Sequence, residues 1–231
     1  MFKNKIWLFI ILFVVPVSFM YLLAKGKTNT NYLQYYGKTE ALAKVTPIKD
    51  FEFMTLDSTL FTKENVKGKT LVVSTLIPSC PTVCPVLFKQ IKFLVYDKIA
   101  NKKDLKDVVF ISHLLDTTGI IPDLKSFVSE QDLDPEKWVF VTGKENPIYD
   151  IDLPFDTITG KSDNLLHSEV PGDVTIGGKT YYKFILLIDK YQKVRGMYLG
   201  DKTNQIERIR TDINALFIEY KDAERAKSEA K

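Results

Sequence analysis

The chain has 231 residues, of which 45% are hydrophobic and 12% aromatic, and its 32 basic and 29 acidic residues leave a net charge of +3. This length allows one full hydrophobic core plus an appendage, and the composition is that of a globular protein rather than a disordered one. The small charge, with lysines scattered along the sequence, excludes nucleic acid as a candidate partner. The presence of only two cysteines excludes a disulfide-stabilised scaffold.

The N-terminal part of the chain predicts a membrane anchor. Residues 6–24 are 19 consecutive residues without a charge, and as a helix they would reach about 28 Å, which is close to the thickness of the hydrocarbon core of a bilayer. A cleaved signal peptide is the alternative, but the apolar run is longer than a usual signal core. We therefore expect an anchor over residues 1–25, followed by a polar tether over residues 26–48.

The globular pattern covers residues 49–220 and is followed by a charged tail, residues 221–231, which we expect to fray. Runs rich in β-branched and aromatic residues predict strands at 51–56, 60–62, 70–75, 108–112, 138–141, 182–188 and 194–198. Helical spacing predicts helices at 85–99, at 124–131 and through 206–220, with a possible helical turn at 146–150. Strands alternate with helices in the middle and pair as hairpins at both ends, which predicts an α/β fold with a mixed sheet.

Both cysteines lie between the strand predicted at 70–75 and the helix predicted at 85–99. Cys80 and Cys84 are four residues apart, so a helix that opens at Cys84 brings the two sulfurs to one side. The free N–H groups at a helix start stabilise a thiolate. Such a pair can close into a disulfide or hold a soft metal ion, and a purely structural role is the plainer alternative.

The order of these elements is similar to that of thioredoxin, although thioredoxin has two residues between its cysteines and this chain has three. The sequence Cys80-Pro81-Thr82-Val83-Cys84-Pro85, together with His167 ahead of the strand that ends at Ile188, resembles the Sco/SenC family of copper chaperones. The likeness extends over residues 46–220 and includes Arg195-Gly196-Met197-Tyr198. A lone histidine in a loop is otherwise more often a solvated residue than a ligand.

The resemblance implies a thioredoxin-like mixed sheet flanked by helices that binds one copper ion per chain through Cys80, Cys84 and His167. It also implies a metallochaperone rather than an enzyme, which helps to assemble the dinuclear copper centre of cytochrome c oxidase. The partners it implies are the copper-receiving subunit of the oxidase and a thiol reductant. The location it implies is the bacterial inner membrane, crossed once, with the domain facing the periplasm.

The chain departs from the family pattern in three places. Leu166 stands directly before His167, where the family commonly has an aspartate, and Asp163 lies four residues before the histidine. The family's Asp-Pro and Arg-Asp-Thr pattern is reduced to the sequence of residues 113–117. An additional segment, residues 169–181, contains a Gly-Gly pair that predicts a small hairpin. These departures bear on partner recognition rather than on copper ligation.

Two questions remain open at this point, the role of His113 and the class of function. His113 follows the strand predicted at 108–112, so it is either a fourth ligand in a zinc-like Cys₂His₂ set or a polar residue at a strand end. The function is either that of a copper-binding assembly factor or that of a thiol-disulfide oxidoreductase using Cys80 and Cys84 on an oxidase subunit. A passive membrane-tethered interaction domain is a third class, and it would leave both cysteines dispensable.

Overall fold

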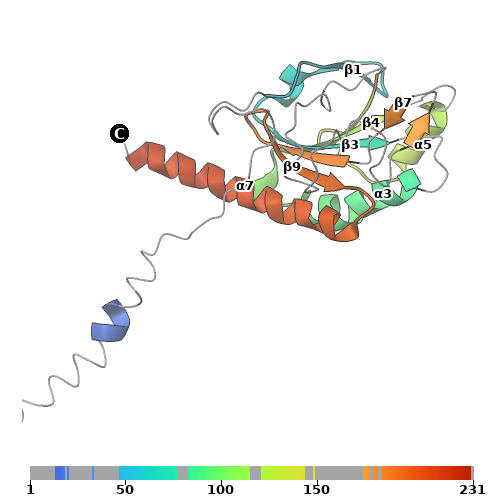
Figure 1. Ribbon diagram of the computed structural model, residues 1–231. Helices are drawn as coiled ribbons and strands as arrows, with labels where there is room; N and C mark the ends of the chain where they lie inside the picture. The colour runs from blue at the N-terminus through green and yellow to red at the C-terminus, as the bar shows by residue number, and fades with distance from the viewer. Residues whose placement is uncertain are drawn as a thin grey trace, which may run out of the picture. The chain divides into compact units, whose positions relative to one another are not determined.

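The computed structural model, shown in Figure 1, describes residues 14–18, 20, 33, 47–76, 83–114, 121–143, 148, 174–176, 179–181 and 184–229. Residues 1–31 and residues 32–231 form two separate compact units. Within the described ranges, no helix is both long and apolar enough to cross a membrane. The predicted anchor falls almost entirely outside those ranges and stays a prediction.

The second unit contains one large mixed sheet. The strands, in chain order, are β1 (Glu52–Thr55), β2 (Leu60–Thr62), β3 (Thr70–Leu76), β4 (Val108–Leu114), β5 (Trp138–Thr142), β6 (Val174–Ile176), β7 (Lys179–Tyr181), β8 (Phe184–Ile188) and β9 (Val194–Leu199). Seven of them pair in the order β2-β1-β5-β4-β3-β8-β9, while β6 and β7 form a separate hairpin. The hairpin confirms the prediction made from the Gly-Gly pair.

Three parallel strands, β3, β4 and β5, form the middle of the sheet. Their sequences are continuous apolar runs because both faces of a central parallel strand are covered, and every residue of β4 is buried. On the far side of β3, strand β8 pairs antiparallel, with Leu71 opposite Ile188. The mixed, thioredoxin-like sheet that the sequence predicts is therefore present.

The longer helices cover one face of this sheet, and the short helix that contains Val66 lies against the other. Their bounds are η3 (Lys63–Val66), α3 (Val83–Ile91), η4 (Lys92–Tyr96), α4 (Asp97–Ile99), η5 (Lys103–Leu105), α5 (Ile121–Ser129) and α7 (Thr203–Glu229). Figure 1 shows α3 and α7 running along the same side of the sheet. The cluster of buried residues on the helical side includes Leu87, Phe88 and Ile91 of α3 and Ile209 and Ile213 of α7.

The opposite face has a core of its own, covered by the first hairpin and the residues around it. Phe53 of β1 and Phe61 of β2 pack there with Phe51, whose ring lies 4.9 Å from that of Phe53. Ile148, which the structure places as a single buried residue, joins the same cluster. The sheet therefore separates two apolar layers, as its alternating side chains require.

The segment from Val83 to Ile99 is one helical run with a π-helical stretch, η4, in its middle. A π turn contains about one residue more than an α turn, so it shifts the apolar stripe around the helix axis. As a result the neighbours Val95 and Tyr96 are both buried, while Phe93 is 63% exposed. Regular helical spacing would not keep both of these neighbours on the apolar stripe of this helix.

Strand β9 carries a close aromatic contact at Gly196. The side chain of Tyr198 lies over this glycine, and a Cβ at position 196 would stand 2.2 Å from the tyrosine hydroxyl oxygen. That hydroxyl donates a hydrogen bond of 2.8 Å to Asp212 Oδ2 on α7. Glycine at 196 therefore allows Tyr198 to connect the edge of the sheet to the long helix.

Most helix boundaries differ from their predictions by two or three residues, and the end of α7 differs by more. Helix α5 begins at Ile121, three residues earlier than expected, because Pro122 fits the first turn of a helix, where its missing N–H costs no hydrogen bond. Helix α7 continues to Glu229, so the charged tail that we expected to fray is helical over residues 221–229. None of these last residues is buried, and that part of the helix contributes nothing to the core.

Candidate functional site

The cysteine pair lies on the connection that leaves the middle of the sheet. Strand β3 ends at Leu76 and α3 begins at Val83. Cys80 falls on the intervening residues 77–82, which lie outside the described ranges. The connection starts at the carboxyl ends of the parallel strands, and ligands of such sheets bind at that end of the strands.

Cys84 is the second residue of α3 and so belongs to its first turn. The helix thus begins two residues before the predicted Pro85, and the expectation that a helix starts at the cysteine pair holds for Cys84. The unpaired N–H groups and the dipole of a helix start favour a thiolate there. The helix is held in place one turn later by Phe88, whose ring lies 5.1 Å from that of Trp138 and 5.2 Å from that of Phe127.

His167 lies outside the described residues, and the topology fixes only where the segment containing it is attached. That segment leaves β5, which ends in register with Leu114 at the end of β4. It returns to the sheet at β8, which runs antiparallel to β3 with Leu186 opposite Val73, so β8 begins on the side of the sheet where β3 ends. The connection with Cys80 and the connection with His167 therefore both attach to the same edge of the sheet.

His113 does not stand at a strand end, contrary to the sequence interpretation. It lies inside β4, between Thr75 of β3 and Val141 of β5, and none of its surface is exposed. Its ring is 4.8 Å from that of Phe53, on the sheet face opposite to α3. The strand prediction stopped too early because a histidine interrupts the apolar run. This environment favours a core residue over a fourth metal ligand.

The buried position of His113 makes the stability of the domain depend on pH. Burial lowers the pKa of His113 from 6.5 to about 4, and a hydrogen bond to the backbone of Gly143 offsets only part of this shift. The unfolded chain takes up this proton near pH 6.5 and the folded chain only near pH 4, so stability is complete above pH 6.5 and is lost as the pH falls through that window. We expect a loss of about 3 kcal/mol.

The measurement is denaturant unfolding at a series of pH values for the wild type and for His113→Leu, which has similar volume and no ionisable group. The difference in unfolding free energy between the two should grow by about 1.4 kcal/mol per pH unit from pH 6 down to pH 4. His167, the second histidine of the chain, is present in both proteins and cancels. Parallel pH profiles would show that His113 is not the titrating group.

A chain of polar contacts under the site was missed by sequence reasoning. Ser74 of β3 and Ser112 of β4 lie 3.1 Å apart through their hydroxyl oxygens, and the indole N–H of Trp138 donates to Ser112 at 2.9 Å. All three side chains are buried between the strands and the helices. Serines in apolar runs give no distinctive signal, so no pattern identifies this contact.

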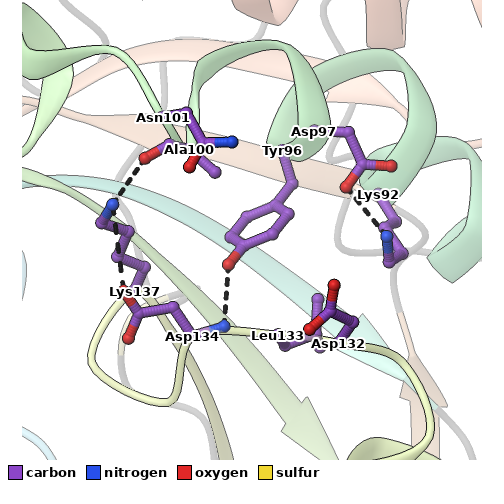
Figure 2. Close-up of a pocket in the computed structure, with 9 residues that line it drawn as sticks. All are labelled: Lys92, Tyr96, Asp97, Ala100, Asn101, Asp132, Leu133, Asp134 and Lys137. Atoms are coloured by element: carbon purple, nitrogen blue, oxygen red, sulfur yellow. Dashed lines mark hydrogen bonds and ion pairs between the residues drawn. The ribbon is translucent and has the colours of Figure 1, made fainter.

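A surface pocket of about 600 Å³ lies at the other edge of the sheet. Figure 2 shows the hydroxyl of Tyr96 near its centre, where it accepts the backbone N–H of Asp134 at 2.9 Å. Lys92 pairs with Asp97 at 2.8 Å, and Lys137 donates to the carbonyl of Ala100. Lys137 directly precedes β5, so the pocket lies at the start of the parallel strands, whereas the cysteines follow their ends.

The described part of the chain contains no group of three or more His, Cys, Asp or Glu side chains that could hold a metal ion. Of the predicted ligands, only the backbone of Cys84 falls inside that part. The structure therefore supplies the scaffold of the predicted site, and the ligand set of Cys80, Cys84 and His167 stays a prediction.

A mixed sheet with a cysteine pair between its central strand and the following helix defines the thioredoxin-like class. Solved structures agree with this fold. BsSco, described as a member of the Sco family of cytochrome c oxidase assembly proteins, is 21% identical with a TM-score of 0.52, and the match covers 74% of this chain and 94% of that one. The copper-bound structure of Arabidopsis thaliana ScoI is 17% identical with a TM-score of 0.50, covering 76% and 99%.

The SCO1/SenC family model matches residues 38–217, and the chain belongs to this family. A SCO1/SenC family lipoprotein from Bacillus anthracis str. Ames is 25% identical with a TM-score of 0.51, over 74% of this chain and 94% of that one. A comparison with curated proteins finds no match. The family is associated with cytochrome c oxidase assembly and with copper binding.

Proposed function

We propose that this protein binds one copper ion through Cys80, Cys84 and His167 and passes it to the copper-receiving subunit of cytochrome c oxidase. The observation that carries the proposal is the position of Cys84 in the first turn of α3, at the sheet edge to which the connections with Cys80 and His167 also attach. Membership of the SCO1/SenC family and the copper bound to the ScoI structure support it.

The chemistry of the three donors suits a copper ion that must be released again. Thiolates are soft ligands that select Cu(I), and a neutral imidazole adds a third donor. Three donors leave room for a ligand from a partner, so the copper ion can be transferred as cargo. Because a disulfide between Cys80 and Cys84 would remove both thiolates, a thiol reductant is part of the proposal.

The second candidate is a thiol-disulfide oxidoreductase that acts on the cysteines of an oxidase subunit. In this case one thiolate of the pair attacks a disulfide of the substrate and the other resolves the mixed disulfide, so the two electrons come from the dithiol. The helix start at Cys84 favours a reactive thiolate here as well. The disulfide switch described for BsSco gives this candidate its support.

The location completes the proposal. We place the protein in the bacterial inner membrane through residues 1–25, with the domain in the periplasm, because copper enters the oxidase on that side. This part rests on the apolar run of residues 6–24 and on the family. A tether then connects the anchor to the domain.

Replacing His167 separates the two candidates. As a copper ligand, its loss should weaken Cu(I) binding at least about tenfold, while the two cysteines still form their disulfide with a reduction potential within about 30 mV of the wild type. We would measure Cu(I) affinity against a competing chelator and the dithiol potential for wild type and His167→Ala. The matched control is His113→Leu, which removes the other, buried histidine and should leave the affinity for Cu(I) unchanged.

The outcomes are distinct. Weakened copper binding with an unchanged potential supports the chaperone. Unchanged copper affinity, together with normal assembly of the oxidase copper centre in cells that carry His167→Ala, would remove His167 from the site. A changed thiol reactivity alone would favour the oxidoreductase.

A further inference from the structure

Arg195 is the largest fully buried side chain in the described part of the chain, with 2% of its surface exposed. It stands at an irregularity in the pairing of β8 and β9, where Leu187 pairs with Gly196 and Ile188 with Val194. Arg195 is thus the extra residue of a β-bulge, and a bulge changes the direction in which a side chain points. Here the side chain reaches helix α7.

The guanidinium of Arg195 binds groups from three parts of the chain. It contacts Glu219 of α7 through two bonds of 3.1 and 2.7 Å and Asp189, in the turn after β8, at 3.3 Å. Its Nη2 also donates a 2.7 Å hydrogen bond to the backbone carbonyl of Leu33. Leu33 lies within residues 26–48, which the sequence predicts to be a tether.

Leu33 makes a second contact with the domain through its side chain. It is partly buried and packs against the apolar cluster on the helical side of the sheet. A polar contact and an apolar contact at the same residue fix both its backbone and its side chain. A freely moving tether would make neither, because ordering a residue costs about 1–2 kcal/mol that must be recovered from contacts.

We propose that Leu33 is a docking point through which the segment ahead of the sheet is strapped to the domain, with Arg195 as its receptor. Without the Leu33 carbonyl, the buried Nη2 of Arg195 would lose one hydrogen-bond acceptor. A buried N–H group that loses its acceptor destabilises the folded state. The folded unit therefore begins at about Leu33, in agreement with the boundary between the two compact units after residue 31.

The strap shortens the predicted tether to the N-terminal segment. Residues 26–48 fully extended would span roughly 80 Å, whereas the eight steps from Lys25 to Leu33 span at most about 29 Å. The cysteine pair would then work within a much smaller distance of whatever holds the first 25 residues. This inference does not depend on the copper proposal.

The test uses the full chain in detergent and limited digestion with chymotrypsin, which cleaves after tyrosine. Cleavage after Tyr35, two residues from Leu33, should be slow in the wild type because it requires the strap to open, and its rate then follows the open population. Leu33→Ala should raise this rate at least about fivefold. Gln34→Ala, the same kind of truncation one residue along, should leave the rate within twofold of the wild type.

Arg195→Lys provides an independent variant, because it keeps the positive charge beside Glu219 and loses the planar fork of donors that contacts three groups at once. It should accelerate cleavage after Tyr35 as Leu33→Ala does. The melting temperature of each variant, measured in parallel, separates opening of the strap from unfolding of the whole domain. Equal cleavage rates for wild type and Leu33→Ala would overturn the proposal, whatever the result for Arg195→Lys.

Discussion

Cys80→Ser and Cys84→Ser should each weaken Cu(I) binding by more than about a hundredfold, because each removes one of two thiolates from a three-donor site. Loss of groups that only orient a metal ligand already costs tenfold to a hundredfold, and loss of a ligand itself costs more. A serine hydroxyl is a hard, neutral donor that does not replace a thiolate on Cu(I). Copper content after dialysis against a competing chelator measures the effect.

Two controls accompany this result, a substitution beside Cys80 and the oxidised wild-type protein. Ser79→Ala changes a neighbour of Cys80 without touching a thiol and should retain one copper per chain. Wild-type protein with Cys80 and Cys84 oxidised to a disulfide should bind no Cu(I) until it is reduced, since it lacks both thiolates. If the double serine variant retained copper against the chelator, the assigned ligands would be wrong.

Arg195→Met should cause the largest loss of stability among single substitutions, about 3–5 kcal/mol. The cause is the charge left behind, because Asp189 has no exposed surface and its pKa is raised by burial even with Arg195 and the backbone N–H groups of Lys193 and Tyr191 opposing the shift. Without the guanidinium, that carboxyl group would be buried beside no cation among its described contacts. The expected fall in melting temperature is about 10 °C.

Arg208→Met is the matched control for this substitution. Arg208 pairs with Asp212 at 3.2 Å, but 68% of its side chain is exposed. Asp212 is buried, but it keeps the hydrogen bond from Tyr198, and the solvated cation of Arg208 contributes at most about 1 kcal/mol. The control should therefore change the melting temperature by only a few degrees. A similar fall in melting temperature for the two variants would mean that the buried contacts of Arg195 stabilise the domain no more than the pair made by Arg208.

The central strands could be predicted from sequence because their physical cause is local. The run Thr70–Leu76 was expected to end one residue earlier, and Val108–Leu114 two residues earlier, just before His113. Continuous β-branched and aromatic residues determine such strands whatever the rest of the fold does. The same holds for the hairpin β6–β7, whose turn is determined by two glycines.

The contacts that decide the stability of the domain were not predictable in this way. From the local pattern alone, Arg195 would be an exposed cation in a half-buried strand. Its side chain turns inward because Arg195 is the extra residue of a β-bulge. The π-helical stretch η4 follows from packing of the helix on the sheet, so Tyr96 was not expected in the core. Both features depend on residues distant in sequence, which local patterns do not contain.

For the candidate site, the position of Cys84 at a helix start was predictable from the strand before it and the helical spacing after it. His113 was misplaced because a histidine is ambiguous between a strand end and a buried strand. The grouping of Cys80, Cys84 and His167 came from the family resemblance, since no spacing rule connects residues 84 and 167. It stays a prediction that the variants above test.

The pairing of β3 with β8 has a consequence for the synthesis of the protein. Leu71 pairs with Ile188, which is 117 residues later in the chain, so at 5–20 residues per second the partner strand follows about 6–23 s after β3 has been made. During that interval one edge of the central strand has no neighbour and can pair with other chains. Cys80 and Cys84 are synthesised just after β3, so both thiols exist well before the sheet that positions them is complete.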